Sequence, residues 1–229
     1  MICITGDIHG DLSRFNDKHI KKLRKNDYLL VCGDFGFLWD GTKREKHILK
    51  KLGKKKYYII FADGCHENFD LLNEYPVSDF AGGKVRIISG RLMHAERGTV
   101  LDLDGKKVFF FGGGQSTDID IRSSAKKWWE DELPIGNEIA EGAENLRLND
   151  NEVDYIVTHE PPGSLKEIFY PNSRQTSEMH AFFNAVKENC RFKMWFFGEC
   201  HKNRLIPPKY KALFDECFII KPDAKPKKR

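Results

Sequence analysis

The sequence predicts a layered α/β fold that contains a mixed β-sheet, and three observations indicate it. Short apolar runs typical of buried strands alternate with segments whose apolar residues recur at helical spacing. Two of the runs are separated by a short turn containing Asp104-Gly105, a residue pair favoured in tight β-hairpins, so one strand pair is antiparallel. Polar residues follow several runs directly, as they do where strands of an α/β sheet end at a ligand site.

The first half of the chain alternates between predicted strands and predicted helices. Strands are expected at ICIT (2–5), YLLVC (28–32) and YYIIFA (57–62). Helices are expected at 11–23, 43–52 and 67–74. This alternation is typical of layered α/β folds with buried sheets.

The second half changes character and predicts antiparallel pairing. The run TVLDLDGKKVFFFGG predicts a hairpin with a type I′ turn. Helices are expected in KKWWEDELP and at 137–148, with Pro134 between them as a breaker. VDYIVTH and FKMWFFG predict two more buried strands, and ALFDECFII predicts a final hairpin region. We expect a single domain over 1–221 and a basic, disordered tail over 222–229.

Composition indicates a globular, cytoplasmic protein. No apolar run approaches the roughly 20 residues that a membrane helix needs, so we expect no membrane partner. The N-terminus MICITGD has no basic region and leads directly into a strand, which predicts no signal peptide. Six scattered cysteines suit reduced thiols better than a disulfide framework. The basic clusters KKLRK and KKLGKKK and the basic tail read as solvated surface; they would tolerate a nucleic-acid substrate but do not require one.

Five predicted strands end in clusters of acidic residues, histidine and cysteine. The clusters are Gly6-Asp7-Ile8-His9-Gly10, Gly33-Asp34, Gly64-Cys65-His66-Glu67, His159-Glu160 and Gly198-Glu199-Cys200-His201. Imidazole and carboxylate groups suit divalent first-row metals, and the neighbouring glycines let the backbone turn sharply beside a ligand. Any one cluster alone could be a capped turn, but five in the same strand-end position indicate a metal site.

In their order along the chain, these clusters resemble the motifs of the calcineurin-like metallophosphoesterases. That superfamily carries Asp-x-His, Gly-Asp, Gly-Asn-His-Glu/Asp, a strand-terminal His and Gly-His-x-His, and the resemblance spans Asp7 to His201. It implies a four-layer α/β/β/α sandwich in which two mixed β-sheets are flanked by helices. It also implies hydrolysis of phosphoesters with two divalent metal ions, which would be Mn, Zn, Fe, Ni or Mg.

The resemblance implies a role for each cluster. One metal would take Asp7, His9, Asp34 and His201. The other would share Asp34 and take the residues at the positions of Cys65, His159 and Glu199. His66 would hydrogen-bond the phosphoryl group or protonate the leaving group, an effect typically worth about 10²–10⁴-fold in rate. Two cations would clamp the phosphoryl oxygens and lower the pKa of a water molecule.

Two residues depart from the family pattern, and both fall on the second metal. Cys65 stands where Asn is expected, and Glu199 stands where the first His of the last motif is expected. Both side chains are competent ligands and would favour a thiophilic metal such as Zn²⁺ or Fe²⁺. The alternative is a weak or absent second metal beside a half-buried cysteine. A structural Cys₂His₂ zinc site and a cysteine nucleophile fit less well, because the C-x₂₋₄-C spacing is missing and a metal-activated water needs no protein nucleophile.

Three further residues are candidates for substrate binding. Arg122, in the glycine-rich segment 112–122, could clamp a phosphate; the alternative is a turn before a capped helix. Asp40 could support His66 or serve only its loop, and Glu160 lies beside the predicted metal. The aromatic residues Phe35, Phe37 and Trp39 could stack a nucleobase or pack in the core.

We therefore expect a metal-dependent phosphoesterase acting on a nucleotide-like or other small phosphodiester. Two alternatives are open: a phosphomonoesterase or protein phosphatase, and a non-catalytic protein that binds a phosphate ligand with an incomplete second metal site. The protein phosphatases carry an Asp-Arg-Gly a few residues after the second motif, and this chain lacks it.

Overall fold

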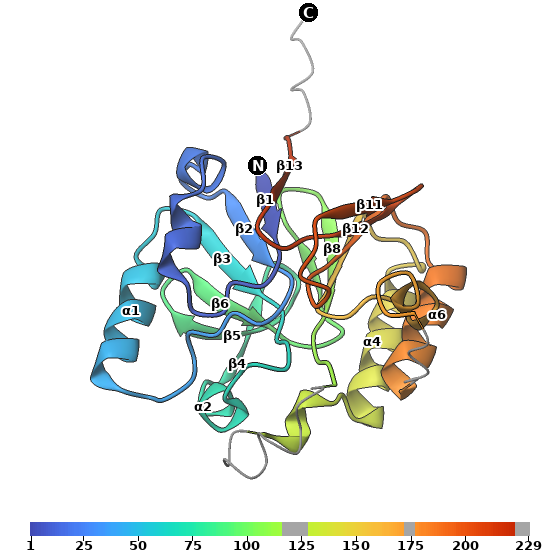
Figure 1. The fold of residues 1–229 in the computed structure, drawn as a ribbon, viewed down its shortest axis with the longest axis horizontal. Helices are drawn as coiled ribbons and strands as arrows, with labels where there is room; N and C mark the ends of the chain where they lie inside the picture. Colours follow the sequence, from blue (N-terminus) through green and yellow to red (C-terminus); the bar gives the residue numbers. More distant parts are fainter. Residues whose placement is uncertain (116–127, 172–176, 223–229) are drawn as a thin grey trace, which may run out of the picture.

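The computed structural model describes residues 1–115, 128–171 and 177–222, which form two β-sheets packed face to face with helices on both outer faces (Figure 1). Each sheet contains both parallel and antiparallel strand pairs. The predicted four-layer sandwich with two mixed sheets is therefore confirmed. The substrate-loop candidate Arg122 and most of the tail lie outside the described residues.

The first sheet has seven strands and is parallel at its centre. Its strands are β1 (Ile2–Thr5), β2 (Tyr28–Val31), β3 (Tyr58–Phe61), β4 (Val77–Phe80), β5 (Gly83–Ser89), β6 (Leu92–Ala95) and β13 (Cys217–Ile220). They lie in the order β13-β1-β2-β3-β6-β5-β4, and β1, β2, β3 and β6 run parallel. The carboxyl ends of β1, β2 and β3 therefore meet at one edge.

The second sheet has six strands and follows the same plan. Its strands are β7 (Val100–Asp102), β8 (Lys107–Phe111), β9 (Tyr155–Thr158), β10 (Met194–Phe197), β11 (Arg204–Ile206) and β12 (Tyr210–Ala212), in the order β11-β12-β10-β9-β8-β7. The predicted hairpin joins β7 to β8, and both Asp104 (φ 56°) and Gly105 (φ 76°) have the positive φ that a type I′ turn requires. Strands β8, β9 and β10 run parallel.

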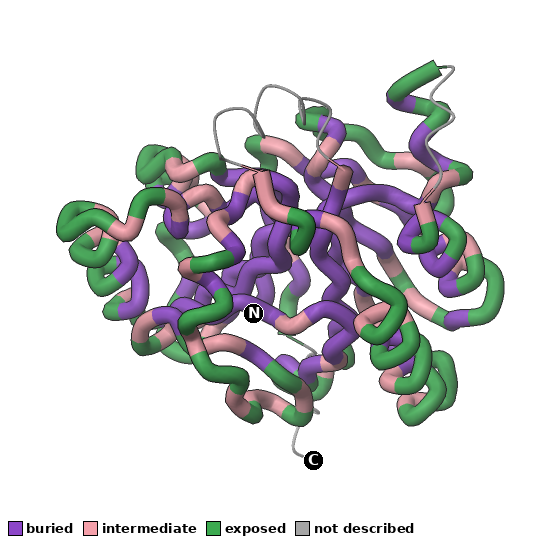
Figure 2. The backbone as a smooth tube through the Cα atoms, turned by 90° about the horizontal axis from the view of Figure 1, so that it is seen from below, coloured by how far each residue is buried: buried purple, intermediate pink, exposed green. Residues whose placement is uncertain are grey.

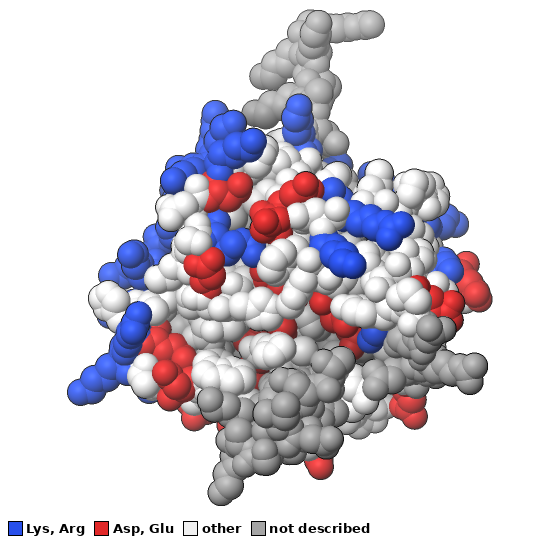
Figure 3. All heavy atoms as spheres, viewed as in Figure 1, with Lys and Arg blue, Asp and Glu red and all other residues white. Residues whose placement is uncertain are grey.

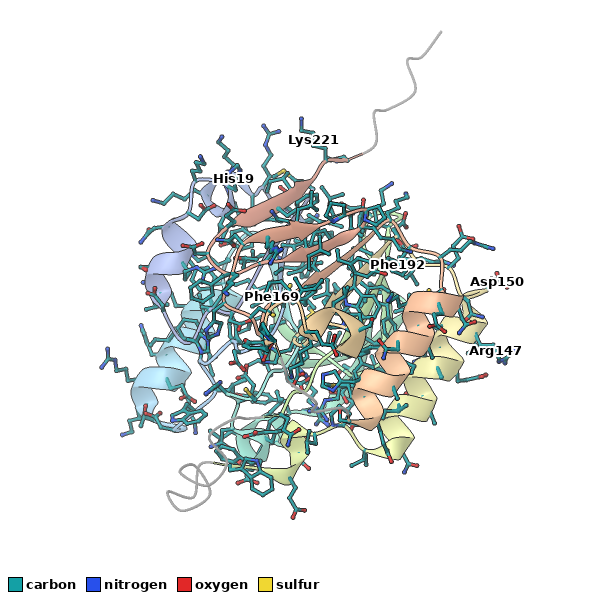
Figure 4. The ribbon with its side chains drawn as sticks, turned by 45° about the vertical axis from the view of Figure 1, so that its right-hand side comes forward. His19, Arg147, Asp150, Phe169, Phe192 and Lys221 are labelled. Carbon is teal, nitrogen blue, oxygen red and sulfur yellow. The ribbon has the colours of Figure 1, made fainter. Side chains whose placement is uncertain are left out.

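Helices cover the two outer faces. They are α1 (Lys43–Gly53), α2 (Phe69–Asn73), α4 (Gly136–Leu148), α5 (Gly163–Lys166) and α6 (Glu178–Asn189), with short 3-10 turns η1 (Leu12–Asn16), η2 (Ile20–Lys22) and η3 (Glu130–Glu132). Helix α1 lies outside the first sheet, and α4 and α6 lie outside the second (Figure 1). Figure 4 places Arg147 and Asp150 at the end of α4, away from the first sheet.

The strands alternate their side chains between two cores, as their period of two requires. Ile2 and Ile4 of β1 face the second sheet and join the core between the sheets, whereas Cys3 faces outward toward α1. In β8, Phe110 faces the first sheet, and Phe109 packs under α6. Figure 2 shows this buried interior running through the centre of the molecule. Both faces of the central strands of each sheet are covered, which explains why these strands read as continuous apolar runs.

The prediction of one helix over 11–23 is wrong. The segment forms two 3-10 turns, η1 and η2, instead of one α-helix. Asp17 separates them: its Oδ1 accepts hydrogen bonds from the backbone N–H groups of His19 (2.6 Å) and Ile20 (3.2 Å). Such a local side-chain bond competes with the continuing helix.

Two other predicted elements are also corrected. ALFDECFII is not a hairpin, because β12 belongs to the second sheet and β13 pairs with β1 in the first. The chain crosses from one sheet to the other between Ala212 and Cys217. Among its described residues, the segment KKWWEDELP forms only the 3-10 turn η3. The residue before this turn, Trp129, makes no side-chain hydrogen bond to the free N–H groups at its start.

Candidate metal centre

Four ligand side chains meet at the shared edge of the two sheets. Asp7 and His9 follow β1, Asp34 follows β2, and His201 follows β10. One ligand atom from each of the four lies within 4.8 Å of the others. This is the set predicted for the first metal, and we refer to it below as the first group.

The first group brings two imidazoles and two carboxylates into close contact. The Nε2 atoms of His9 and His201 lie 3.0 Å apart, and His201 Nε2 lies 3.0 Å from Asp7 Oδ2. Asp7 is fully buried, and apart from this contact and a 3.6 Å approach of His159 Nδ1 to its Oδ1, its carboxylate oxygens make no hydrogen bond in the described structure. A buried carboxylate with so few donors is costly, and a bound cation removes that cost.

The backbone at the first group is strained. His9 (φ 49°), Asp34 (φ 40°) and His201 (φ 47°) all lie in the left-handed region that non-glycine residues rarely adopt. Each such residue costs on the order of 1–3 kcal/mol and persists only where its surroundings hold it. Hydrogen bonds from the N–H groups of Ile8 and His9 to the Asp34 carbonyl oxygen (3.1 and 2.8 Å) hold the first two loops together. Strain of this kind concentrates at functional sites.

Glycine is required beside two of the carboxylates. A Cβ atom at Gly198 would lie 1.8 Å from Asp7 Oδ1, and one at Gly64 would lie 2.1 Å from Asp34 Oδ1. These glycines were predicted to leave room for a ligand. In the structure, the carboxylates of Asp7 and Asp34 occupy the space that a side chain at these glycines would need.

A second group shares Asp34 with the first. Asp34, Cys65 and His66 offer ligand atoms within 4.8 Å of one another. Cys65 Sγ lies 3.9 Å from Asp34 Oδ2 and 3.8 Å from Nε2 of the buried His159, and His159 Nε2 lies 3.7 Å from Asp34 Oδ1. The structure thus brings together three of the four predicted ligands of the second metal.

Glu199 is the predicted ligand that faces elsewhere. Its Oε2 accepts a hydrogen bond from Cys200 Sγ (3.4 Å), and its Oε1 lies 4.0 Å from Nζ of the buried Lys166. Burial and the neighbouring Glu160 carboxylate raise the pKa of Glu199. Like His159, Glu199 is absent from both groups of converging ligand atoms among the described residues, so its exclusion rests on its contacts with Lys166 and Cys200.

His66, the predicted catalytic residue, contacts the shared carboxylate. Its Nδ1 lies 2.6 Å from Asp34 Oδ2, and its side chain is 39% exposed. This hydrogen bond, together with one to Cys65, raises the pKa of His66 to about 10. Burial alone would raise the pKa of Asp34, but His159 and His66 outweigh it and hold the pKa well below the usual range. The shared carboxylate is therefore ionised and ready to bind a cation.

Two predicted substrate residues, Glu160 and Asp40, have structural partners in the fold. Glu160 is buried and accepts hydrogen bonds from Lys166 Nζ and His180 Nε2, both 2.6 Å away. Asp40 accepts from the N–H of Thr42 at the start of α1, so the structure shows the loop role that was the alternative for it. Glu67 supports the second loop, because its Oε1 accepts from the N–H of Phe35 at 2.5 Å.

The aromatic platform is largely part of the core. Phe35 and Phe37 are buried, and Phe35 stacks on Phe61 with ring centroids 4.5 Å apart. The idea that these two rings stack a nucleobase is therefore wrong. Trp39 is half-buried and contacts Trp129 edge to face, at 5.8 Å between centroids.

Sequence reasoning missed the network that anchors the loop carrying Cys65. Asp63 lies just after β3 and is fully buried, where it accepts hydrogen bonds from Arg97 Nη2 (2.6 Å) and His94 Nε2 (2.9 Å). Its carbonyl oxygen also accepts from the N–H of Gly113 (3.1 Å). The available signal was an acidic residue at the end of an apolar strand, but its partners come from a distant part of the chain.

Comparison with known proteins agrees with the geometry. A model of the family described as calcineurin-like phosphoesterase matches residues 1–202. The chain belongs to this family. It is therefore a metallophosphoesterase, one of a family of hydrolases that typically depend on divalent metals, and the first group is its candidate metal site.

Other comparisons add little to the family assignment. None of the curated proteins matches the chain. Among solved structures, a phosphopantetheinyl hydrolase from Mycobacterium tuberculosis is 13% identical, over 93% of this chain and 89% of its own, with a TM-score of 0.39. A likeness this weak does not say which substrate this chain takes.

The surface around the site is mixed in charge. Lys and Arg side chains gather along one edge, over the η turns and α1 (Figure 3), and Lys21, Lys22, Lys50 and Lys51 among them are exposed, as predicted for solvated faces. Within the described ranges, no helix is long and apolar enough to cross a membrane.

Proposed function

We propose that the protein hydrolyses small, nucleotide-like phosphodiesters with two divalent metal ions at the shared sheet edge. The observation that carries the proposal is the first group: four ligand atoms from three separate strand ends converge around a fully buried Asp7 carboxylate, whose close polar contacts are imidazole nitrogens. A buried carboxylate among imidazoles fits a divalent cation, because the cation would compensate its charge and share the same imidazole ligands.

The residues divide into two sets that share one carboxylate. Asp7, His9, Asp34 and His201 would hold the first ion, and Asp34 would also contribute to the second. A carboxylate suits this shared position because it has two oxygens. Divalent ions at such a pair of sites supply positive charge for the phosphoryl oxygens and lower the pKa of water.

His66 would donate a proton to the leaving oxygen. Its Nδ1 is engaged by Asp34 Oδ2 at 2.6 Å, which leaves Nε2 as the nitrogen for a substrate. The half-exposed ring lies beside His9, at 5.4 Å between centroids, so it borders the first group. In the metal-free protein, the hydrogen bonds to Asp34 and Cys65 raise the pKa of His66 to about 10, which favours the protonated imidazole that a general acid requires.

A substrate and metal panel tests the proposal. Purified protein is stripped of metal, reloaded with Mn²⁺, Zn²⁺, Fe²⁺, Ni²⁺ or Mg²⁺, and assayed with a chromogenic phosphodiester and a chromogenic phosphomonoester. We expect turnover that needs metal and favours the diester. A preference for the monoester would indicate that the protein is a phosphatase and not a phosphodiesterase. Binding of inorganic phosphate without turnover under every metal would indicate a non-catalytic binding protein.

A further inference from the structure

We propose that the second metal is held by a thiolate: Cys65, His159 and Asp34 form a sulfur-containing site that favours Zn²⁺ or Fe²⁺ over Mg²⁺, and Glu199 is not a ligand. The inference deepens the proposed function, because it rests on the sharing of Asp34 between two ions. It concerns this chain's own departures from the family pattern, at the two positions where Asn and His were expected.

The distances between the three ligand atoms suit one small cation. Zn–S bonds are about 2.3 Å and Zn–N bonds about 2.0–2.1 Å, so sulfur and nitrogen on one tetrahedral ion lie about 3.5 Å apart. Cys65 Sγ lies 3.8 Å from His159 Nε2 and 3.9 Å from Asp34 Oδ2. Only a few tenths of an ångström of movement would bring these atoms to bonding distance.

The ligands are held in place by close packing. His159 is 1% exposed, and a Cβ atom at Gly33 would lie 2.2 Å from its Nδ1, so the imidazole ring lies directly against the backbone. Cys65 is 8% exposed, and its neighbour Gly64 packs against Asp34. The closely packed His159 ring and the burial of Cys65 preorganise the site for an ion in a largely dry environment.

Glu199 faces the ammonium group of Lys166 and not the proposed metal site. The Nζ of buried Lys166 lies 4.0 Å from Glu199 Oε1, and Cys200 Sγ donates to Oε2. Lys166 is itself fixed by a 2.6 Å contact to Glu160. A carboxylate that faces this lysine is compensated where it lies, whereas Cys65 faces a histidine and a carboxylate that both bind metals well.

Cobalt binding provides a test that does not depend on hydrolysis. Co²⁺ is titrated into the metal-stripped full chain, and the thiolate-to-cobalt charge-transfer absorption in the near ultraviolet is recorded. We expect the band to rise to one thiolate-bound ion per chain, and Zn²⁺ but not Mg²⁺ to displace it. In C65S and C65A the band should disappear, and bound Zn²⁺ should fall from two ions per chain to one.

Matched variants separate the candidates. C200S removes another buried thiol near the site and should keep the band. E199Q should keep both the band and two bound Zn²⁺ ions, and H66A should keep the band if His66 is not the nitrogen ligand. Circular dichroism and thermal melting identify any variant that fails to fold. Because C65S and C65A both remove the thiol, the test can still be made if one of them fails to fold.

Each outcome bears on one proposal. A band that persists in both Cys65 variants, or two Zn²⁺ ions bound to the wild type without a band, overturns the thiolate site. Loss of the second ion in E199Q overturns the exclusion of Glu199. A normal band without turnover of any phosphoester would contradict the proposed function and leave the thiolate site standing, so the two can fail separately.

Discussion

The two halves of the candidate metal centre share Asp34 but differ in almost every other property. In the first group, the side chains of His9 and His201 are 33% and 48% exposed, so this half opens toward solvent. In the second, Cys65 and His159 are nearly completely buried. The first half consists of imidazole and carboxylate, and the second contains a thiol.

The difference indicates that the halves have different tasks. An open half lets substrate and water reach an ion, whereas a buried half with a sulfur ligand holds an ion firmly and exchanges it slowly. If both proposed ions are bound, the shared Asp34 would couple the halves, because a change at this carboxylate would reach both ions. We therefore expect distinct effects on activity, metal content and stability from different variants. The variants below affect both halves, the catalytic histidine, the second half alone or the first half alone.

The largest effect is expected for D34N, which alters both halves at once. Asparagine tolerates the left-handed backbone found at Asp34 (φ 40°), so the fold should persist. We expect kcat/KM to fall on the order of 10³-fold or more, because several kcal/mol of charge stabilisation are lost. Elemental analysis should show less than one metal ion per chain. Full metal content with normal turnover would contradict the shared carboxylate.

His66 should affect rate and leave metal content unchanged. In H66Q we expect kcat to fall by about 10²–10⁴-fold, with a larger loss for an alkyl leaving group than for p-nitrophenol, since the better leaving group needs less protonation. The control is H47Q, which alters an exposed histidine on α1. An equal loss for both leaving groups would mean that His66 does not act as the general acid.

Acid stability should depend on the network behind the second half. Burial would raise the pKa of Glu160, but His180 and Lys166 outweigh it and lower the pKa to about 2. Because the folded pKa lies below the ordinary value of 4.5, this stabilisation is full above pH 4.5 and is lost as pH falls toward 2. It amounts to at most about 3 kcal/mol.

Denaturation of E160Q and wild type across this pH range checks the acid prediction. The variant should be less stable at neutral pH, and the difference should shrink as pH falls toward 2. E144Q is the control, since Glu144 forms an exposed pair with Arg147 and should change stability little at any pH. A difference for E160Q that stays constant with pH would refute the assignment.

The smallest effect is expected for G198A, which disturbs the first half alone. The added Cβ would lie 1.8 Å from Asp7 Oδ1 and must displace this ligand. We expect calorimetric affinity for the first Mn²⁺ to fall about 10–100-fold, as when the support of a ligand is altered. G136A is the matched control, because nothing lies within 4 Å of its added Cβ. The cobalt–thiolate absorption should be unchanged in G198A; its loss would show that the halves are not separable.

Much of the fold could be predicted because its signals are local. Apolar runs located β1, β2, β3, β9 and β10, and Asp104-Gly105 located the hairpin. Strands β4 and β5 were not predicted, since they lie toward the edge of the first sheet and expose many of their side chains; the short buried strand β6 was not recognised either. The final strand was paired with the wrong partner, because pairing β13 with β1 joins the two ends of the chain.

The candidate site followed from the same local signals up to a definite point. Strand ends predicted that Asp7, His9, Asp34 and His201 would meet, and the structure brings them together. The substrate roles expected for Glu160 and Asp40 could not be judged from the sequence, because Lys166 and His180 reach Glu160 only in the folded chain. The side chains that compensate the charge of Glu160 lie in α5 and α6, and no local sequence pattern connects these helices to Glu160.

The sequence by itself therefore determined the layered fold, the edge at which the ligands gather and the ligand types available there, including the unusual Cys65. Strand period and turn chemistry act over a few residues, and they fix these features. Only the tertiary structure decided between the two unusual residues. Cys65 faces His159 and Asp34, whereas Glu199 faces Lys166. The reason is physical: a buried charge is stable only beside its partner, and long-range packing selects that partner.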